Sequence, residues 1–164
     1  MMLHQHALLD VAVPLAEPQP AMPTTPLNHD DWRSDATLLL VEDDGLVRRF
    51  VADILHLLGY HVLEACDGLE AMQIHAEFSG CIDVLLTDIV MPHLSGLELA
   101  ERLRCERPAM HIIYMSGYSF MSVVQRPLRD GEEAFIAKPF TMRTLLETLR
   151  VSGCATMHDG AISG

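Results

Sequence analysis

The sequence is poor in positive charge. Its 164 residues include 11 Lys and Arg against 23 Asp and Glu, which gives a formal net charge of −12 at pH 7. A surface that binds nucleic-acid phosphates needs clustered Lys and Arg side chains. We therefore expect no nucleic-acid partner. The excess of acidic residues can instead serve solubility or the binding of a divalent cation.

Cysteine motifs and long apolar runs are also missing. The four cysteines form no CxxC pair and no spacing typical of a metal site; they are Cys66, Cys81, Cys105 and Cys154. We therefore predict reduced, mostly buried thiols and a cytoplasmic location. No apolar run approaches the roughly 20 residues of a membrane span, so we expect no membrane association.

Targeting and nucleotide-binding motifs are absent as well. The N-terminal segment MMLHQHALLDVAV contains no Lys or Arg, so it has no basic n-region, and Asp10 interrupts its apolar run. Both features argue against a signal peptide. No predicted strand is followed by GxGxxG, GxxxxGKS or GxxxxGKT. The usual nucleotide-binding sites are therefore excluded.

The chain divides into three parts by composition. Residues 1–35 hold five of the nine prolines and show no sustained hydrophobic period. Such a stretch buries too little apolar surface to offset its ordering entropy. We predict a flexible Pro-rich arm over residues 1–35, one folded domain over 36–150, and a flexible tail over 151–164.

Short apolar runs alternate with helical patterns in the folded domain. We predict strands over residues 37–41, 61–65, 84–87, 111–115 and 134–137. Helical spacing follows each of them, over 46–58, after Asp67, over 95–106, weakly over 120–125, and after Thr141. Strands joined by helices imply right-handed crossovers and a parallel sheet. The predicted fold class is therefore α/β, with five βα units in a doubly wound sheet.

Polar residues mark the carboxyl ends of four predicted strands. Glu42 and Asp43 follow the first, Asp88 ends the third, Ser116 follows the fourth and Lys138 follows the fifth. In a doubly wound sheet these ends share one edge, where ligands bind. Three carboxylates in one place repel each other unless a cation neutralises them, and oxygen ligands of this kind suit Mg²⁺. The strand ends therefore predict a magnesium site.

Asp88 and Lys138 also have ordinary interpretations. Asp88 could simply end a buried strand, and most lysines are exposed and solvated. Lys138, however, is the only lysine in the chain, where the other ten basic residues are arginines. A compact ammonium serves as a point-charge partner for carboxylate or phosphoryl oxygens, which a planar guanidinium does not replace. Together with the other strand ends, this favours a functional cluster.

Four segments carry these strand ends: LLLVEDDGLVRR, LLTDIVMPHLSG, IIYMSGYS and FIAKPF. In their order and approximate spacing they resemble the receiver domain of two-component response regulators, over about residues 36–150. They are most similar in style to receivers attached to hybrid sensor kinases and to stand-alone, single-domain receivers. The resemblance implies a flavodoxin-like (βα)5 fold with strand order 2-1-3-4-5.

The resemblance also implies the residues of a phosphorylation site. Asp88 would be the phosphoacceptor, a carboxylate nucleophile that forms an aspartyl phosphate. Asp43 and Asp88 would bind Mg²⁺ directly, Glu42 through water, and Val90 through its backbone carbonyl. Each of these roles is an expectation for the residue that matches the family's motif.

Three further residues would respond to the phosphate. The hydroxyl of Ser116 would hydrogen-bond the phosphoryl group, and Lys138 would be its cationic partner. Phe135 stands where the family has an aromatic switch residue, often tyrosine. Phenylalanine has no hydroxyl, so an output that needs that hydrogen bond is not expected here.

The implied function is that of a phosphoacceptor response regulator in a His-Asp phosphorelay, and not of a classical enzyme. The expected partners are a sensor histidine kinase, hybrid kinase or phosphotransfer protein, and a downstream target protein. Phosphorylation would switch a surface formed by the fourth helix, fifth strand and fifth helix, which could also carry a phosphorylation-linked dimer. Because only fourteen residues follow Arg150, we expect no effector domain.

Two other functions fit parts of the pattern. A receiver-like module that binds partners without phosphorylation would need none of the charged cluster. An aspartate-nucleophile phosphatase would need a second acid two residues after the nucleophile, where this sequence has Val90. The complete cluster of five residues favours the phosphoacceptor over both.

Overall fold

The computed structural model describes residues 36–117, 128–129 and 131–152. Strands and helices alternate there as β1 (Thr37–Val41), α1 (Gly45–Leu57), β2 (His61–Ala65), α2 (Gly68–Glu77), β3 (Val84–Asp88), α3 (Gly96–Glu106), β4 (His111–Ser116), β5 (Glu133–Ala137) and α5 (Met142–Val151). The predicted arm, the short helix at 120–125 and most of the predicted tail lie outside the described residues. Val151, which we assigned to the tail, is the last residue of α5.

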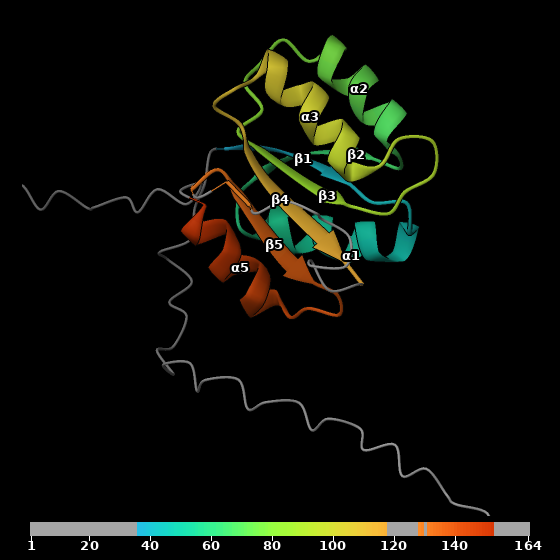
Figure 1. Cartoon of the computed structure of the whole chain (residues 1–164). Coiled ribbons are helices and arrows are strands. Elements are labelled where there is room, and N and C mark those ends of the chain that lie inside the picture. Colours follow the sequence, from blue (N-terminus) through green and yellow to red (C-terminus); the bar gives the residue numbers. More distant parts are fainter. Residues whose placement is uncertain (1–35, 118–127, 130, 153–164) are drawn as a thin grey trace, which may run out of the picture.

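The strands form one parallel sheet in the order β2-β1-β3-β4-β5. Helices α2 and α3 cover one face of this sheet, and α1 and α5 cover the other (Figure 1). The predicted doubly wound α/β fold and its strand order are therefore confirmed. No helix among the described residues is both long enough and apolar enough to cross a bilayer.

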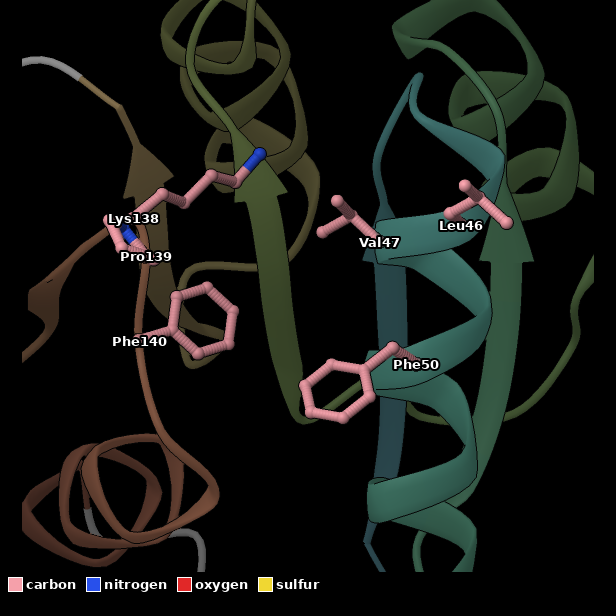
Figure 2. Close-up of a pocket in the computed structure, with 6 residues that line it drawn as sticks. All are labelled: Leu46, Val47, Phe50, Lys138, Pro139 and Phe140. Atoms are coloured by element: carbon pink, nitrogen blue, oxygen red, sulfur yellow. The ribbon is translucent and has the colours of Figure 1, made fainter.

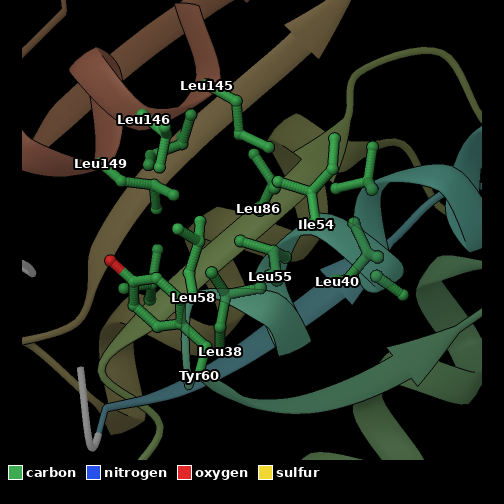
Figure 3. Close-up of a cluster of buried hydrophobic side chains, with 14 of the residues drawn as sticks. Leu38, Leu40, Ile54, Leu55, Leu58, Tyr60, Leu86, Leu145, Leu146 and Leu149 are labelled. Atoms are coloured by element: carbon green, nitrogen blue, oxygen red, sulfur yellow. The ribbon is translucent and has the colours of Figure 1, made fainter. Parts of the chain in front are cut away.

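The core consists of two apolar layers, one on each face of the sheet. Alternate residues of β1 point to opposite faces, so Leu38 and Leu40 pack with α1 and α5, as Figure 3 shows, whereas Leu39 and Val41 pack on the other side. All five residues of β3 are buried. Each fully buried leucine contributes roughly 1.5–3 kcal/mol. Since both faces are covered, polar chemistry is confined to the ends of the strands.

Helix caps make the turns at the strand ends short. The side chain of Asp44 accepts hydrogen bonds from the first turn of α1, and Asp67 does the same for α2. Ser95 and Glu98 form a capping box at α3, and Thr141 caps α5. Asp67 and Thr141 thus cap the two helices that we predicted to follow them. Such caps satisfy amide groups that the helix itself leaves unpaired.

The prediction of mostly buried cysteines is wrong for the described residues. Cys66, Cys81 and Cys105 are all exposed free thiols. Cys66 and Cys81 lie in connections next to β2 and β3, and Cys105 lies on the outer side of α3, away from the buried Leu103. Cysteine is on average a buried residue, but these three lie outside the apolar faces.

Gly96 allows α3 to begin directly beside the end of β3. Its amide donates a hydrogen bond of 3.0 Å to the carbonyl of Ile89. A Cβ atom at Gly96 would lie 2.0 Å from the backbone oxygen of Asp88, much closer than two such atoms can approach. Only glycine therefore permits this contact without moving the end of β3.

We expect Gly96→Ala to destabilise the fold by at least about 1–3 kcal/mol, because the added methyl group must displace the backbone at Asp88. Gly45→Ala is a matched control, since Gly45 is likewise the first residue of its helix, but a Cβ atom there would meet only Arg48 Nη2, at 3.7 Å. Urea unfolding followed by circular dichroism measures both. Equal stability of the two variants would contradict the close packing at Gly96.

Candidate functional site

Three charged side chains meet at the carboxyl edge of the sheet. The Lys138 ammonium nitrogen lies 2.6 Å from Glu42 Oε2 and 2.6 Å from Asp88 Oδ2. Lys138 is separated in sequence from these two residues by 96 and 50 positions. The predicted convergence of the strand ends therefore brings at least three of the predicted site residues into direct contact.

The strand register explains this contact. Val41 of β1 pairs with Thr87 of β3, so the residues that follow them, Glu42 and Asp88, come side by side at the end of the sheet. On the other side, the backbone amide of Lys138 donates a 2.7 Å hydrogen bond to the carbonyl of Ser116. The Lys138 side chain then reaches past β4 to the two carboxylates.

Burial and hydrogen bonding together set the charge state of this cluster. Glu42 is only 1% exposed, and this burial raises the pKa of its carboxyl because the hydrogen bond and charge of Lys138 offset it only in part. Burial alone would lower the pKa of Lys138, but its hydrogen bonds to Asp88 and Glu42 outweigh that effect and raise the pKa. Lys138 therefore remains a cation in contact with both acids.

The acidic residues fit a divalent cation. One carboxylate oxygen each from Glu42, Asp43 and Asp88 lies within 4.8 Å of the others. Mg²⁺ binds oxygen ligands octahedrally at about 2.0–2.1 Å, so its ligands lie about 2.9–4.2 Å apart. The upper limit of 4.8 Å is slightly above that range. The donor type and the spacing therefore suit Mg²⁺.

Val90 lies beside the same carboxylate. Its backbone amide donates a 3.2 Å hydrogen bond to Asp88 Oδ1, the oxygen that Lys138 does not contact. Both oxygens of Asp88 thus accept a hydrogen bond from the protein. The loop that follows contains His93, whose φ of 68° lies in the left-handed region.

Ser116 lies further along the same end of the sheet, and Phe135 lies two residues before the end of β5. Ser116 is the fully buried last residue of β4, one position after Met115, which pairs with Asp88. Phe135 is half-buried in β5, pairs with Tyr114 and packs against the core layer of α2 and α3. The two residues thus connect the site to β5, the edge strand of the sheet.

An apolar groove beside the site was missed by sequence reasoning. Its cavity of about 500 Å³ lies between α1 and the connection from β5 to α5, and Figure 2 shows the lining residues: Leu46, Val47, Phe50, Lys138, Pro139 and Phe140. Leu46 and Phe50 belong to the apolar residues that recur at helical spacing in α1, but they are 84% and 54% exposed. The available signal was that the apolar residues of α1 cover more than one face of the helix.

Arg48 was also missed. Its Nη1 donates a 2.6 Å hydrogen bond to the backbone carbonyl of Glu42. Nothing in the spacing of charged residues singles out Arg48 from the neighbouring Arg49, because the contact depends on where α1 lies relative to the end of β1.

The chain resembles curated proteins of two-component signalling. It is 36% identical over 120 residues to the sensor kinase CckA of Brucella abortus, covering 73% of this chain and 13% of that protein. The chain thus spans only a small part of that kinase. It is also 36% identical to the response regulator receiver protein CpdR of Brucella abortus, covering 68% of this chain and 92% of CpdR.

A solved structure agrees with the fold and the sequence. The response regulator protein TrrA from Thermotoga maritima, crystallised in complex with Mg²⁺-BeF, aligns with a TM-score of 0.60 and 30% identity over 70% of this chain and 96% of TrrA. Residues 38–150 match the response regulator receiver domain as a family. With the fold, the acidic edge and these similarities in agreement, the chain belongs to the response regulator receiver domain family.

Proposed function

We propose that this chain is a phosphoacceptor response regulator in which Mg²⁺-dependent phosphorylation of Asp88 switches a partner-binding surface. The observation that carries the proposal is the Lys138 ammonium held 2.6 Å from Asp88 Oδ2 and 2.6 Å from Glu42 Oε2. A carboxylate positioned in this way can attack phosphorus, as aspartate nucleophiles do. The chain then acts as a phosphoacceptor in a His-Asp phosphorelay rather than as a classical enzyme.

Phosphoryl transfer depends mainly on positioning and on stabilising negative charge that is spread over the phosphoryl oxygens. An oxygen of Asp88 forms the new bond to phosphorus, and the bond between phosphorus and the histidine nitrogen of the donor breaks. Lys138 is already in contact with Asp88, so its charge can follow the phosphoryl group. Bound Mg²⁺ would neutralise further negative charge.

The residues that would hold Mg²⁺ are Asp43 and Asp88 directly, Glu42 through water, and Val90 through its carbonyl. Three observations support this: the acidic cluster within 4.8 Å, the contact of Val90 with Asp88, and the Mg²⁺-BeF complex of the related TrrA. Glu42 would in addition keep Lys138 beside Asp88, because it shares the same ammonium.

The signal would leave the site through Ser116 and Phe135. The phosphoryl group would attract the Ser116 hydroxyl, and Phe135 would move into the space that Ser116 vacates. A change of this kind biases a two-state surface without new covalent structure. The helix predicted at 120–125, which lies outside the described residues, would form part of that surface. A phosphorylation-linked dimer would form through the same surface.

The upstream partner would be a sensor histidine kinase, a hybrid kinase or a phosphotransfer protein, and the downstream partner a target protein. The apolar groove next to Lys138 supports a protein partner at this edge, since exposed apolar surface of this kind marks interaction sites. We place this exchange in the cytoplasm, where thiols such as the exposed Cys66, Cys81 and Cys105 remain reduced.

Incubation with acetyl phosphate and Mg²⁺ is expected to add one phosphoryl group, detected by intact-protein mass spectrometry. Asp88→Asn removes the nucleophile, so its mass should not change, and chelation of Mg²⁺ should abolish the gain in wild type. Asp53→Asn, an exposed aspartate on α1, is the matched control and should be phosphorylated normally. A wild-type protein that gains no mass would instead favour the phosphorylation-independent interaction module.

Lys138→Arg is expected to slow phosphorylation by acetyl phosphate on the order of 100-fold, the usual effect of losing one positioned donor. The charge is kept, but a planar guanidinium cannot place a point charge between Glu42 and Asp88. Arg143→Lys, the reverse exchange at an exposed position of α5, should leave the rate unchanged. Mass spectrometry of samples quenched at successive times measures both rates. A wild-type rate in Lys138→Arg would show that the mechanism does not need the lysine ammonium.

Phe50→Ser is expected to slow phosphoryl transfer from a phosphorylated histidine phosphotransfer domain by roughly tenfold, the effect of losing a moderate interface contact. Transfer from acetyl phosphate, which needs no protein docking, should be unaffected. Leu57→Ser provides the control, because Leu57 is an exposed apolar residue near the other end of α1 and does not line the groove. If both variants accept phosphate equally fast from the donor protein, the groove is not its docking site.

A further inference from the structure

Arg48 connects three elements behind the acidic residues. It belongs to the first turn of α1, its Nη1 donates a 2.6 Å hydrogen bond to the carbonyl of Glu42, and its Nε lies 3.8 Å from Glu64 Oε2 on β2. Its side chain is largely covered, with 24% exposed. Arg48 therefore spans the end of β1 from the helix that follows it to the neighbouring strand.

The contact fixes the peptide group that joins the two acidic residues. The amide of Glu42 donates to the carbonyl of Ala65 at 3.2 Å, and its carbonyl accepts from Arg48. A peptide group is planar, so the orientation of the Glu42 carbonyl also sets the position of the Asp43 backbone nitrogen. By this route Arg48 influences where the exposed Asp43 carboxylate can lie.

The location of Arg48 is electrostatically unfavourable for the helix alone. The positive end of the helix dipole lies at the N-terminus, where acidic side chains are preferred and cations are not. The first turn of α1 contains no acidic residue and does contain this arginine. Its contacts with Glu42 and Glu64 provide the compensation, and one of them holds the backbone of the acidic pair.

We propose that Arg48 is a positioning residue for divalent-cation binding: by holding the Glu42 carbonyl, it orients Glu42 and Asp43 toward the cation. This inference rests on the proposed function, because it concerns the same Mg²⁺. It predicts that loss of Arg48 weakens Mg²⁺ binding, which is opposite to the effect of removing its positive charge. An arginine near a cation site repels the cation, so loss of its charge would strengthen Mg²⁺ binding, whereas loss of its positioning contact would weaken it.

The test compares Arg48→Lys and Arg48→Gln with Arg49→Lys and Arg49→Gln by titration calorimetry with MgCl₂. Arg49 is the adjacent, exposed residue of α1. We expect both Arg48 variants to raise the Mg²⁺ dissociation constant roughly tenfold, as residues that orient metal ligands commonly do. The Arg49 variants should match wild type, or bind slightly more tightly where the charge is lost.

Arg48→Lys keeps the charge and suits a helix, so it provides a folded variant even where Arg48→Gln does not. Thermal unfolding without Mg²⁺ separates the metal effect from a loss of stability, because a merely structural role would lower the unfolding temperature and leave the dissociation constant unchanged. Arg48→Lys with wild-type affinity would overturn this inference alone. Wild-type protein that binds no Mg²⁺ would overturn it together with the proposed function.

Discussion

The bridge that Lys138 makes between Glu42 and Asp88 is the interaction on which the site depends. Burying two carboxylates side by side costs free energy, because both lose contact with water and repel each other. A cation held between them offsets this cost. Lys138 supplies one positive charge at 2.6 Å from each. With Asp43 close by, the cluster keeps an excess of negative charge. Lys138 alone does not neutralise the negative charge of the three carboxylates, whereas Lys138 and a bound dication together would.

The parallel sheet brings Glu42, Asp88 and Lys138 together at the carboxyl ends of its strands. Helices cover both faces, so the residues of β3 before Asp88 are buried and, apart from Thr87, apolar. The capped helices begin within a few residues of the strand ends, and Gly96 brings α3 against the backbone of Asp88 itself. Asp88, the proposed nucleophile, is therefore held by rigid elements, and its partly exposed side chain lies at the end of the sheet.

Much of this could be predicted from the sequence because parallel topology converts distance along the chain into proximity. Once the apolar runs defined the strands, Glu42, Asp88 and Lys138 had to share an edge. The groove and Arg48 could not be predicted in the same way. Periodicity indicates which residues of α1 share a face but not which face has a neighbour, so the exposure of Leu46 and Phe50 could not be predicted. The contact of Arg48 with Glu42 depends on a long side chain and on a helix position that no pattern specifies.

Lys138 belongs to both the acidic cluster and the wall of the groove. A phosphoryl group on Asp88 would compete with Glu42 for its ammonium, and any movement of that side chain would alter the groove. A partner bound in the groove could prefer one position of Lys138. Coupling between two sites is reciprocal, so such a partner must shift the phosphorylation equilibrium by the same factor by which phosphorylation changes its affinity. If Asp88 is phosphorylated as proposed, the single lysine of this chain would directly connect phosphoryl chemistry to protein recognition, separately from the longer proposed route through Ser116 and Phe135.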